Sequence, residues 1–319
     1  MKIHFLILSI LMIMSSCQYK SNSNTTDNDE IVSINKDTIK IKPKYTISYS
    51  FEETNNNYDY SFFLKTKKEL DLINRIRYNL KDSIEIEHNN EQEQVYIDSF
   101  MVITDEFNLK MHDLLSNFNS WSCPFKNLGK ETGVNLYKSK DGKLRLYDWN
   151  ISPFYKYSYP YKSVAQFLNN KGEIVLKEIP FIINDSVVIP AYIAQLYDIK
   201  IDNTNHYLIV SGYQEEDFKW MMLRVYKIQN DSFVTIPCFE KDDSSVHDSD
   251  VKGNYANQLL LSTFSQYRYD IEFDAETNTI QYNNVPTESR SFGSAYYENK
   301  IKYKLIDGKF IRIKKELKK

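Results

Sequence analysis

Apolar residues recur at helical spacing in two stretches of the N-terminal half. The later stripe has intervals of three or four residues: Phe100, Ile103, Phe107, Met111, Leu114 and Phe118. An earlier and weaker stripe has the same spacing: Leu70, Ile73, Ile76 and Leu80. The run Thr66-Lys67-Lys68-Glu69 matches a capping box at the start of the first stripe, and a polar gap at 87–94 separates the two. These stripes predict an antiparallel helical pair over about 66–120, with its apolar faces buried against each other or against a sheet.

Beyond Pro124 the helical period is lost and short apolar runs follow one another at hairpin spacing. Strand-like segments lie near 162–168, 173–178, 186–199, 206–213, 219–229, 232–239, 257–273 and 279–282. Turn residues separate several of them and no crossover helix intervenes, so we expect antiparallel pairing. The predicted fold class is α+β: an N-terminal helical pair followed by a large antiparallel β region, either a sandwich or a strongly curved sheet. Two further strand-like runs, 31–34 and 45–51, precede the helices.

Two hairpins carry Asp-Gly turns, Asp141-Gly142 and Asp307-Gly308. Three-residue loops with the glycine in the left-handed region would align apolar residues across each hairpin. The first hairpin would then pair Leu136 with Leu146, and Val134 and Leu144 would share their face. The second would pair Tyr303 with Ile311 and Ile301 with Ile313, leaving Lys302 and Lys304 in water. A two-residue loop is the alternative; it would set Arg312 opposite Tyr303.

The composition disfavours several classes of function and indicates no particular activity. The chain of 319 residues has 40 basic and 43 acidic residues, so no global electrostatic footprint for nucleic acid is present. It contains 8 glycines, and no two of them are closer than four residues apart, which disfavours phosphate-binding loops and dinucleotide folds. The 25 tyrosines and 18 phenylalanines favour half-buried β surfaces.

The first residues, MKIHFLILSILMIMSSC, combine one lysine, a short apolar run and small residues before Cys17. The apolar run is too short for a spanning helix, which needs roughly 20 residues, and fits the core of a signal peptide. Met14-Ser15-Ser16-Cys17 resembles the lipobox of bacterial lipoproteins, whose cysteine is diacylated and becomes the N-terminus. Residues 1–16 are therefore expected to be a signal peptide, and 17–30 the lipidated cysteine and a polar, flexible tether. An ordinary secretory signal with an incidental Cys17 is the alternative.

Two motifs extend this resemblance: the Ser139–Trp149 string SKDGKLRLYDW and the closing Tyr303–Phe310 string YKLIDGKF. Both are similar to patterns in uncharacterised envelope lipoproteins of the Bacteroidota. The resemblance implies a shared β architecture, and its motifs are hairpin turns that carry no catalytic residue. It implies attachment through the lipid alone, most simply at the outer membrane of a Gram-negative bacterium. Because acidic residues begin only at Asp27, a periplasmic position gains weight over surface display.

The mature chain divides into a mixed segment, 31–125, and the β region, 126–319. Its two remaining cysteines, Cys123 and Cys238, could form a disulfide, but two unpaired and mostly buried thiols are the favoured alternative. No histidine pairs with another His, Glu or Cys at the spacing of metal ligands. Asp248, Asp250 and Gly253 match three positions of a calcium-binding loop, but Lys252 occupies a ligand position and Leu259 replaces the bidentate glutamate. A solvated loop is favoured there, so neither a metal nor a cofactor is expected. Serine-hydrolase signatures are absent from the sequence, whereas a carboxylate pair for hydrolysis cannot be recognised from one sequence.

The densest aromatic feature is the run Pro153–Tyr161, PFYKYSYPY. Its rings could stack on sugars or grip a peptide, and the alternative is that they fill the core and flank an edge strand. We take Tyr155, Tyr157, Tyr159 and Tyr161 as weak candidates for binding. The functional hypothesis is therefore non-enzymatic binding of a carbohydrate or protein partner. Its rivals are an envelope hydrolase with an unrecognised carboxylate pair and a structural or immunity lipoprotein.

Overall fold

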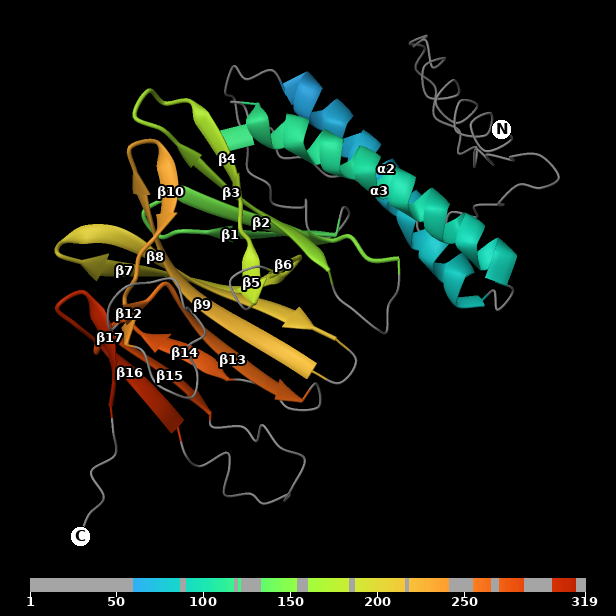
Figure 1. Ribbon diagram of the computed structural model, residues 1–319. Coiled ribbons are helices and arrows are strands. Elements are labelled where there is room, and N and C mark those ends of the chain that lie inside the picture. The colour runs from blue at the N-terminus through green and yellow to red at the C-terminus, as the bar shows by residue number, and fades with distance from the viewer. Residues whose placement is uncertain are drawn as a thin grey trace. The chain divides into compact units, whose positions relative to one another are not determined.

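The computed structural model confirms an α+β protein in which a helical pair precedes a large, mainly antiparallel β region (Figure 1). The structure describes these residues: 60–86, 90–117, 120–121, 133–153, 160–183, 187–215, 218–240, 255–264, 270–283 and 300–313. All of them belong to one compact unit, Glu53–Lys319. The expected strands at 31–34 and 45–51, together with Cys17 and its tether, lie outside the described residues.

The helices are α2 (Tyr60–Ile86) and α3 (Asn90–Ser116). Most of both predicted stripes is buried in them, and Leu70, Phe100, Phe107 and Met111 have no exposed surface. Ile76 is half-buried, and Phe118 lies outside the described residues. The predicted helix starts were wrong. Helix α2 already runs from Tyr60, which puts Thr66 inside it at 6% exposure, and α3 begins within the expected polar gap. The glutamates and glutamines of that gap are good helix formers, so polarity alone did not mark a break.

Three larger sheets and one two-stranded sheet follow in the described part of the chain. The first sheet is an antiparallel meander in the order β1-β2-β3-β4: β1 (Val134–Lys138), β2 (Leu144–Asn150), β3 (Tyr161–Leu168) and β4 (Ile174–Glu178). A short hairpin comes next: β5 (Phe181–Ile183) and β6 (Val187–Ile189). Strand β2 is buried on both faces, because consecutive residues from Leu146 to Trp149 are all buried. A strand that is covered on both faces lies between two layers.

The central sheet has the order β10-β9-β8-β7, and β13 also pairs with β9: β7 (Tyr192–Ile201), β8 (Thr204–Gln214), β9 (Phe218–Gln229), β10 (Ser232–Thr235) and β13 (Gln258–Phe264). Its long hairpins turn at Asp202-Asn203 and Asn230-Asp231, where all four residues have positive φ. Asn and Asp tolerate that region better than most residues, and such turns match the twist of paired strands.

The third sheet has the order β12-β11-β17-β16-β15-β14: β11 (Phe239–Glu240), β12 (Tyr255–Ala256), β14 (Ile271–Asp274), β15 (Thr279–Asn283), β16 (Lys300–Ile306) and β17 (Lys309–Arg312). One pairing departs from the antiparallel prediction. Strands β11 and β17 run parallel and meet at Phe239 and Phe310, whose rings stack with centroids 5.3 Å apart.

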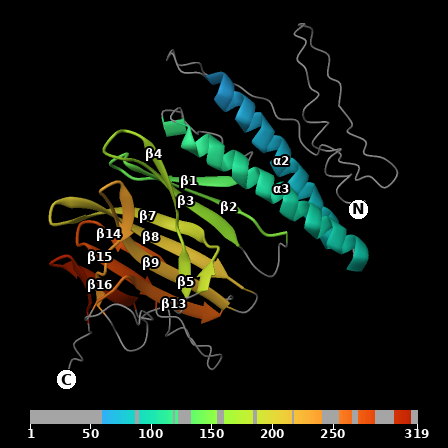
Figure 2. The same cartoon turned by 45° about the horizontal axis from the view of Figure 1, so that its top comes forward.

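The central sheet is buried on both faces. Leu208, Leu223 and Val225 point toward the third sheet and form one core with Tyr303 and Phe310. On the opposite face, Tyr207, Ile209 and Tyr226 pack against residues of the first sheet. The sheets therefore form successive layers, with the helical pair beside the outer face of the first sheet (Figures 1 and 2). This layering is a sandwich extended by one sheet rather than a single curved sheet.

Polar contacts join the helices to the first sheet. Gln166 of β3, fully buried, donates from Nε2 to the backbone oxygen of Leu115 at 2.7 Å and to Oγ of Ser120 at 2.8 Å. Trp149 donates from Nε1 to Oδ1 of Asn108 at 2.8 Å, and its ring meets Phe107 edge to face. Because a buried polar group without a partner is costly, these bonds specify where the pair docks. Within the described residues, neither helix is long and apolar enough to cross a membrane.

Positive φ at both turn glycines is confirmed, but the predicted registers were wrong. Gly142 and Gly308 have φ of +70° and +74°. In the first hairpin Tyr137 pairs with Leu146 and Leu136 with Tyr147, because the loop holds an even number of residues. Ser139 closes that loop: its backbone N–H donates to the oxygen of Leu144, and its Oγ donates to Oδ1 of Asp141.

In the last hairpin Tyr303 pairs with Arg312 and Leu305 with Phe310 across a two-residue turn. Tyr303 is buried and Lys302 and Lys304 are exposed, as expected. Ile311, however, shares the outer face with Lys304. Phe310 takes the inward position because its ring stacks on Phe239, and that one large ring outweighs the burial of two isoleucines.

Candidate functional site: a pocket at Arg224

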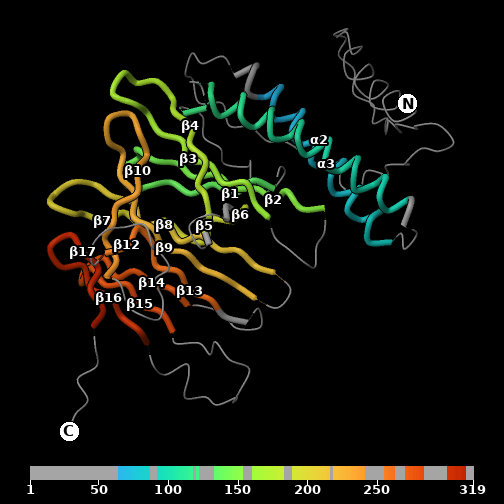
Figure 3. The backbone as a smooth tube through the Cα atoms, viewed as in Figure 1, coloured from blue at the N-terminus to red at the C-terminus, as the bar shows by residue number. Residues whose placement is uncertain are grey.

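Two strands pair with the same edge of β9, each along a different part of it, and a hollow lies where they meet. Strand β10 pairs with the C-terminal part of β9, where Thr235 lies opposite Tyr226. Strand β13 pairs with the N-terminal part, where Gln258 lies opposite Arg224. Figure 3 shows β10 and β13 beside opposite ends of β9. The two partners meet at Val225, whose backbone oxygen accepts from the N–H of Ile236 at 2.9 Å, and the side chains of Arg224 and Tyr226 lie on either side of this point.

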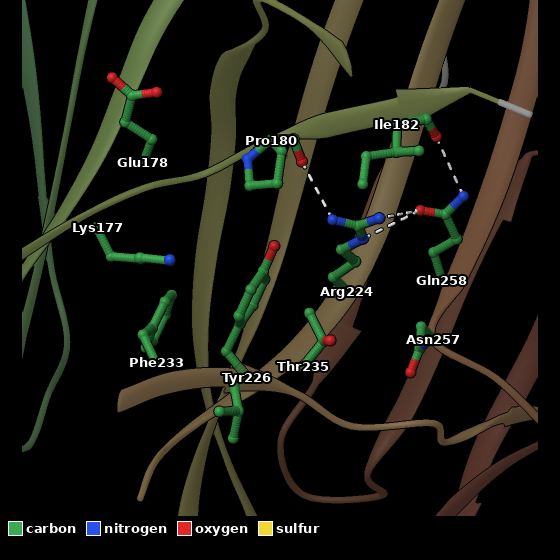
Figure 4. Close-up of a pocket in the computed structure, with 11 residues that line it drawn as sticks. Lys177, Glu178, Pro180, Ile182, Arg224, Tyr226, Phe233, Thr235, Asn257 and Gln258 are labelled. Atoms are coloured by element: carbon green, nitrogen blue, oxygen red, sulfur yellow. Dashed lines mark hydrogen bonds between the residues drawn. The ribbon is translucent and has the colours of Figure 1, made fainter. Parts of the chain in front are cut away.

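A pocket of about 490 Å³ occupies this place, roofed by the link between β4 and β5 (Figure 4). Its lining consists of Lys177, Glu178, Pro180, Ile182, Arg224, Tyr226, Phe233, Val234, Thr235, Asn257 and Gln258. This volume is within the range of small-molecule sites. A second cavity, between α2 and the first sheet near Arg77, measures about 20 Å³ and has room for little more than a water molecule. The larger cavity, which we call the Arg224 pocket, is therefore the candidate site.

Arg224 is the chemical centre of the pocket. Its side chain leaves β9 on the face toward the first sheet and is 7% exposed. Gln258 Oε1 accepts from both Nε, at 3.0 Å, and Nη2, at 2.6 Å, and the backbone oxygen of Pro180 accepts from Nη1 at 3.2 Å. Gln258, 2% exposed, is itself held by a bond from Nε2 to the oxygen of Ile182 at 3.1 Å. The guanidinium is thus fixed in place by neutral acceptors.

Tyr226 supplies a second polar group. It is 4% exposed, and its hydroxyl faces the guanidinium without forming a hydrogen bond to any residue that the structure describes (Figure 4). Burial raises the pKa of Tyr226 and the nearby Arg224 lowers it, with a net rise. The phenol therefore stays protonated at neutral pH and can donate a hydrogen bond. Its ring stacks on Phe233 with centroids 4.5 Å apart and planes 3° apart, which makes this wall rigid and apolar.

The rim of the pocket carries one charge of each sign, whereas the charge of Arg224 lies in the interior. Lys177 and Glu178 are both exposed. Glu178 forms an ion pair with Lys162 at 2.9 Å, and Figure 4 shows its carboxylate directed away from the guanidinium. Glu178 is the one carboxylate among the described residues that line the pocket. A pair of acids for hydrolysis is therefore not assembled by this lining.

The residues singled out from the sequence lie elsewhere. Tyr155, Tyr157 and Tyr159 are outside the described residues, and Tyr161 is half-buried with its ring against Tyr192, centroids 5.8 Å apart. The aromatic run therefore stays a prediction. Cys238 is a free thiol with no exposed surface, and burial raises its pKa to about 12. Its possible disulfide partner Cys123 is outside the described residues. In the described part of the chain, no three His, Cys, Asp or Glu side chains gather as a metal site would require.

Sequence reasoning missed the Arg224 pocket, although a signal was present. Arg224 interrupts the run Trp220–Tyr226, WMMLRVY, in the middle of an apolar strand. A lone arginine in a doubly buried strand needs a special environment, because charged residues are rarely fully buried. The partner Gln258 gave no signal, since only the pairing of β9 with β13 brings it opposite Arg224.

Comparison of the chain with protein-family models, with curated proteins and with solved structures finds no match.

Proposed function

We propose that this protein is a lipid-anchored protein of the bacterial cell envelope that binds a ligand non-enzymatically in the Arg224 pocket. The ligand would be part of a carbohydrate or protein partner. One observation carries the binding proposal: a cavity of about 490 Å³ whose floor presents a buried cation held only by neutral acceptors. Such a cavity with a few convergent polar groups is typical of binding sites.

The envelope location rests on the sequence alone. A short signal that ends in Met14-Ser15-Ser16-Cys17 supports lipidation of Cys17, and the polar tether after it supports attachment at a distance from the membrane. The outer membrane of a Gram-negative bacterium is the proposed site. Mass spectrometry of the protein from its native envelope should find a diacylated Cys17 at the mature N-terminus. An unmodified N-terminus beyond Cys17 would contradict the anchor while leaving the pocket proposal intact.

Binding is favoured over hydrolysis because the pocket contains one carboxylate, Glu178, which is already paired with Lys162. General acid–base hydrolysis of a glycoside uses two acids on opposite sides of the scissile bond. Arg224, Tyr226 and Gln258 can orient a ligand, but a guanidinium is a hydrogen-bond donor without an acceptor site, and burial holds the phenol neutral, so neither serves as a base near pH 7.

A substitution that fills the pocket tests this proposal. Thr235→Trp places an indole at a half-buried lining position, and Thr279→Trp makes the same change at a half-buried position of β15 outside the pocket. Full-length protein in detergent is screened by calorimetry against envelope oligosaccharides and peptides. A true ligand should bind the Thr235→Trp variant at least about tenfold more weakly, and the Thr279→Trp variant unchanged. Equal binding to all three proteins would place the site elsewhere, and hydrolysis of a panel member would favour the enzyme.

A further inference from the structure

The Arg224 pocket contains a positive charge that no described side chain neutralises. The guanidinium, 7% exposed, bonds to Gln258 and to the backbone of Pro180, and neither group is an anion. Removing a cation from water without an opposite charge is expensive, and natural proteins usually pair such a group. An anion that enters the pocket would therefore gain from a charge already desolvated and oriented.

Donors in the pocket exceed the acceptors available to them. A guanidinium has five N–H groups, and three hydrogen bonds of Arg224 go to Gln258 and Pro180. The two remaining N–H groups have no acceptor among the described residues other than the Tyr226 hydroxyl oxygen, whose contact with Arg224 lowers the pKa of the phenol. The neutral Tyr226 hydroxyl, buried and facing the guanidinium, adds a third donor without a hydrogen-bonded acceptor in the described part of the chain. A guanidinium and a phenol O–H that line one cavity favour a ligand group made of acceptor oxygens.

We propose that the ligand of the Arg224 pocket bears a carboxylate, which takes the guanidinium and the Tyr226 hydroxyl as its donors. This inference rests on the proposed binding function and names the chemical class of the ligand. A planar carboxylate offers two oxygens with about four lone-pair sites, which suit two N–H groups of one guanidinium and one O–H. A single buried cation matches its single negative charge better than a phosphate dianion.

The rest of the ligand is apolar next to the carboxylate. The stacked rings of Tyr226 and Phe233, together with Pro180 and Ile182, form the walls around the polar floor. An aromatic or aliphatic group attached to the carboxylate would be buried against these walls. Lys177 at the rim, exposed and positive, would attract an anion from a distance without selecting its shape.

The probe pair is benzoate and benzamide, which share ring and size but differ in charge. Calorimetry on the full-length protein in detergent should find that benzoate binds at least about tenfold more tightly than benzamide, because a charge-assisted bond to a buried guanidinium is stronger than a neutral one. Phenyl phosphate tests the competing anion. Hippurate, which imitates a peptide C-terminus, and phenyl glucuronide, an acidic sugar, identify the source of the carboxylate.

Two substitutions connect the preference to named atoms. Arg224→Met keeps an unbranched side chain but removes the charge, and should abolish the preference for benzoate over benzamide. Tyr226→Phe removes only the hydroxyl and keeps the stack on Phe233, and should weaken benzoate about three- to tenfold with little effect on benzamide. Lys302→Met, at an exposed position of β16 that does not line the pocket, removes one positive charge and should change neither. Circular dichroism confirms folding; if Arg224→Met is unfolded, Tyr226→Phe decides.

The outcomes separate the two proposals. Benzoate preference that is lost in Arg224→Met or reduced in Tyr226→Phe supports the carboxylate assignment. If benzamide and benzoate bind equally, or if phenyl phosphate binds more than tenfold tighter than benzoate, the assignment is overturned while the binding function stands. If no member of the panel binds at millimolar concentration, the carboxylate assignment and the pocket as the binding site both fail.

Discussion

A buried ionisable side chain can make the stability of a protein depend on pH, and Asp148 is the clearest case in this protein. Its side chain, with no exposed surface, lies on β2 facing the central sheet. Its carboxylate accepts from the backbone N–H of Ile193 at 2.6 Å and from Nδ2 of Asn135 at 2.7 Å. Burial raises its pKa to about 6, because the two hydrogen bonds that favour the charged form offset only part of the desolvation.

Asp148 should make the protein less stable as pH rises. An unfolded aspartate has a pKa near about 3.9, so the folded protein binds more protons between pH 4 and 6. The free energy of unfolding should therefore fall over that range, by up to about 3 kcal/mol from this residue. Tyr137, whose hydroxyl donates to the oxygen of Ile193, does not interfere, because burial raises its pKa far above this range.

Urea denaturation of the wild type and of Asp148→Asn at pH 4, 5.5 and 7 measures this contribution. The amide remains neutral throughout, so the wild type should lose stability relative to the variant as pH rises. Parallel pH dependence of the two proteins would show that Asp148 is ionised at pH 4 already, and that burial does not dominate its pKa.

At the scale of elements, the two Asp-Gly hairpins have the same glycine conformation in different surroundings. At Gly142, φ is +70° and an added Cβ would meet nothing within 4 Å. At Gly308, φ is +74° and an added Cβ would lie 2.9 Å from Cγ2 of Ile201, a core residue of β7 that cannot easily move. The last hairpin is thus packed against the central sheet at its turn, whereas the first turn is open at this position.

Alanine substitutions should separate these costs. Gly142→Ala should lower the free energy of unfolding by about 1 kcal/mol, the cost of a left-handed conformation with a side chain. Gly308→Ala should cost about 1–2 kcal/mol more, because the methyl group also overpacks against Ile201. Chemical denaturation of the two variants supplies the comparison. Equal losses would indicate that the third sheet shifts at little cost to accept the methyl group.

The same hairpins show what local sequence can and cannot predict. Burial of the helical stripes follows from spacing alone, and the strands follow from short apolar runs, because both patterns are local. Register does not, since a glycine with positive φ fits both the observed even loops and the expected odd ones. At the last hairpin the register depends on the stacking of Phe310 on Phe239, which lies 71 residues earlier in the chain.

The Arg224 pocket escaped prediction for a related reason. It requires β10 and β13, which are separated by a long connection, to share one edge of β9. No local pattern encodes that shared edge. An arginine in an apolar strand can be recognised from the sequence, but its glutamine partner and the phenol beside it become a site only when the sheet is assembled.

For the molecule as a whole, the central sheet is the element on which the other layers depend. One of its faces forms a core with the third sheet, and the other forms a core with the first sheet, which in turn carries the helical pair. Neither core is complete without strands β8 and β9, because Leu208 and Leu223 belong to one core while Tyr207 and Tyr226 belong to the other. Cooperative unfolding of all the layers is therefore expected.

Leu223→Ala tests this dependence from one side. Leu223 has no exposed surface and faces the third sheet, so its truncation should cost about 2–5 kcal/mol. Ile306→Ala, at a position of β16 that is 47% exposed, is the matched control and should cost no more than about 0.5 kcal/mol. Urea transitions are followed by circular dichroism at the helical band and by tryptophan fluorescence, to which Trp149 contributes from the contact between α3 and the first sheet.

In both variants the two signals should coincide, and in Leu223→Ala they should move together to lower urea. The reason is geometric: the mutation lies in the core of the third sheet, yet the helices and Trp149 report from the opposite side of the central sheet. Loss of β9 removes Tyr226 from the second core at the same time as Leu223 from the first. If the helical signal keeps the wild-type midpoint while the overall stability falls, the helical pair and first sheet fold independently, and the central sheet does not couple the layers.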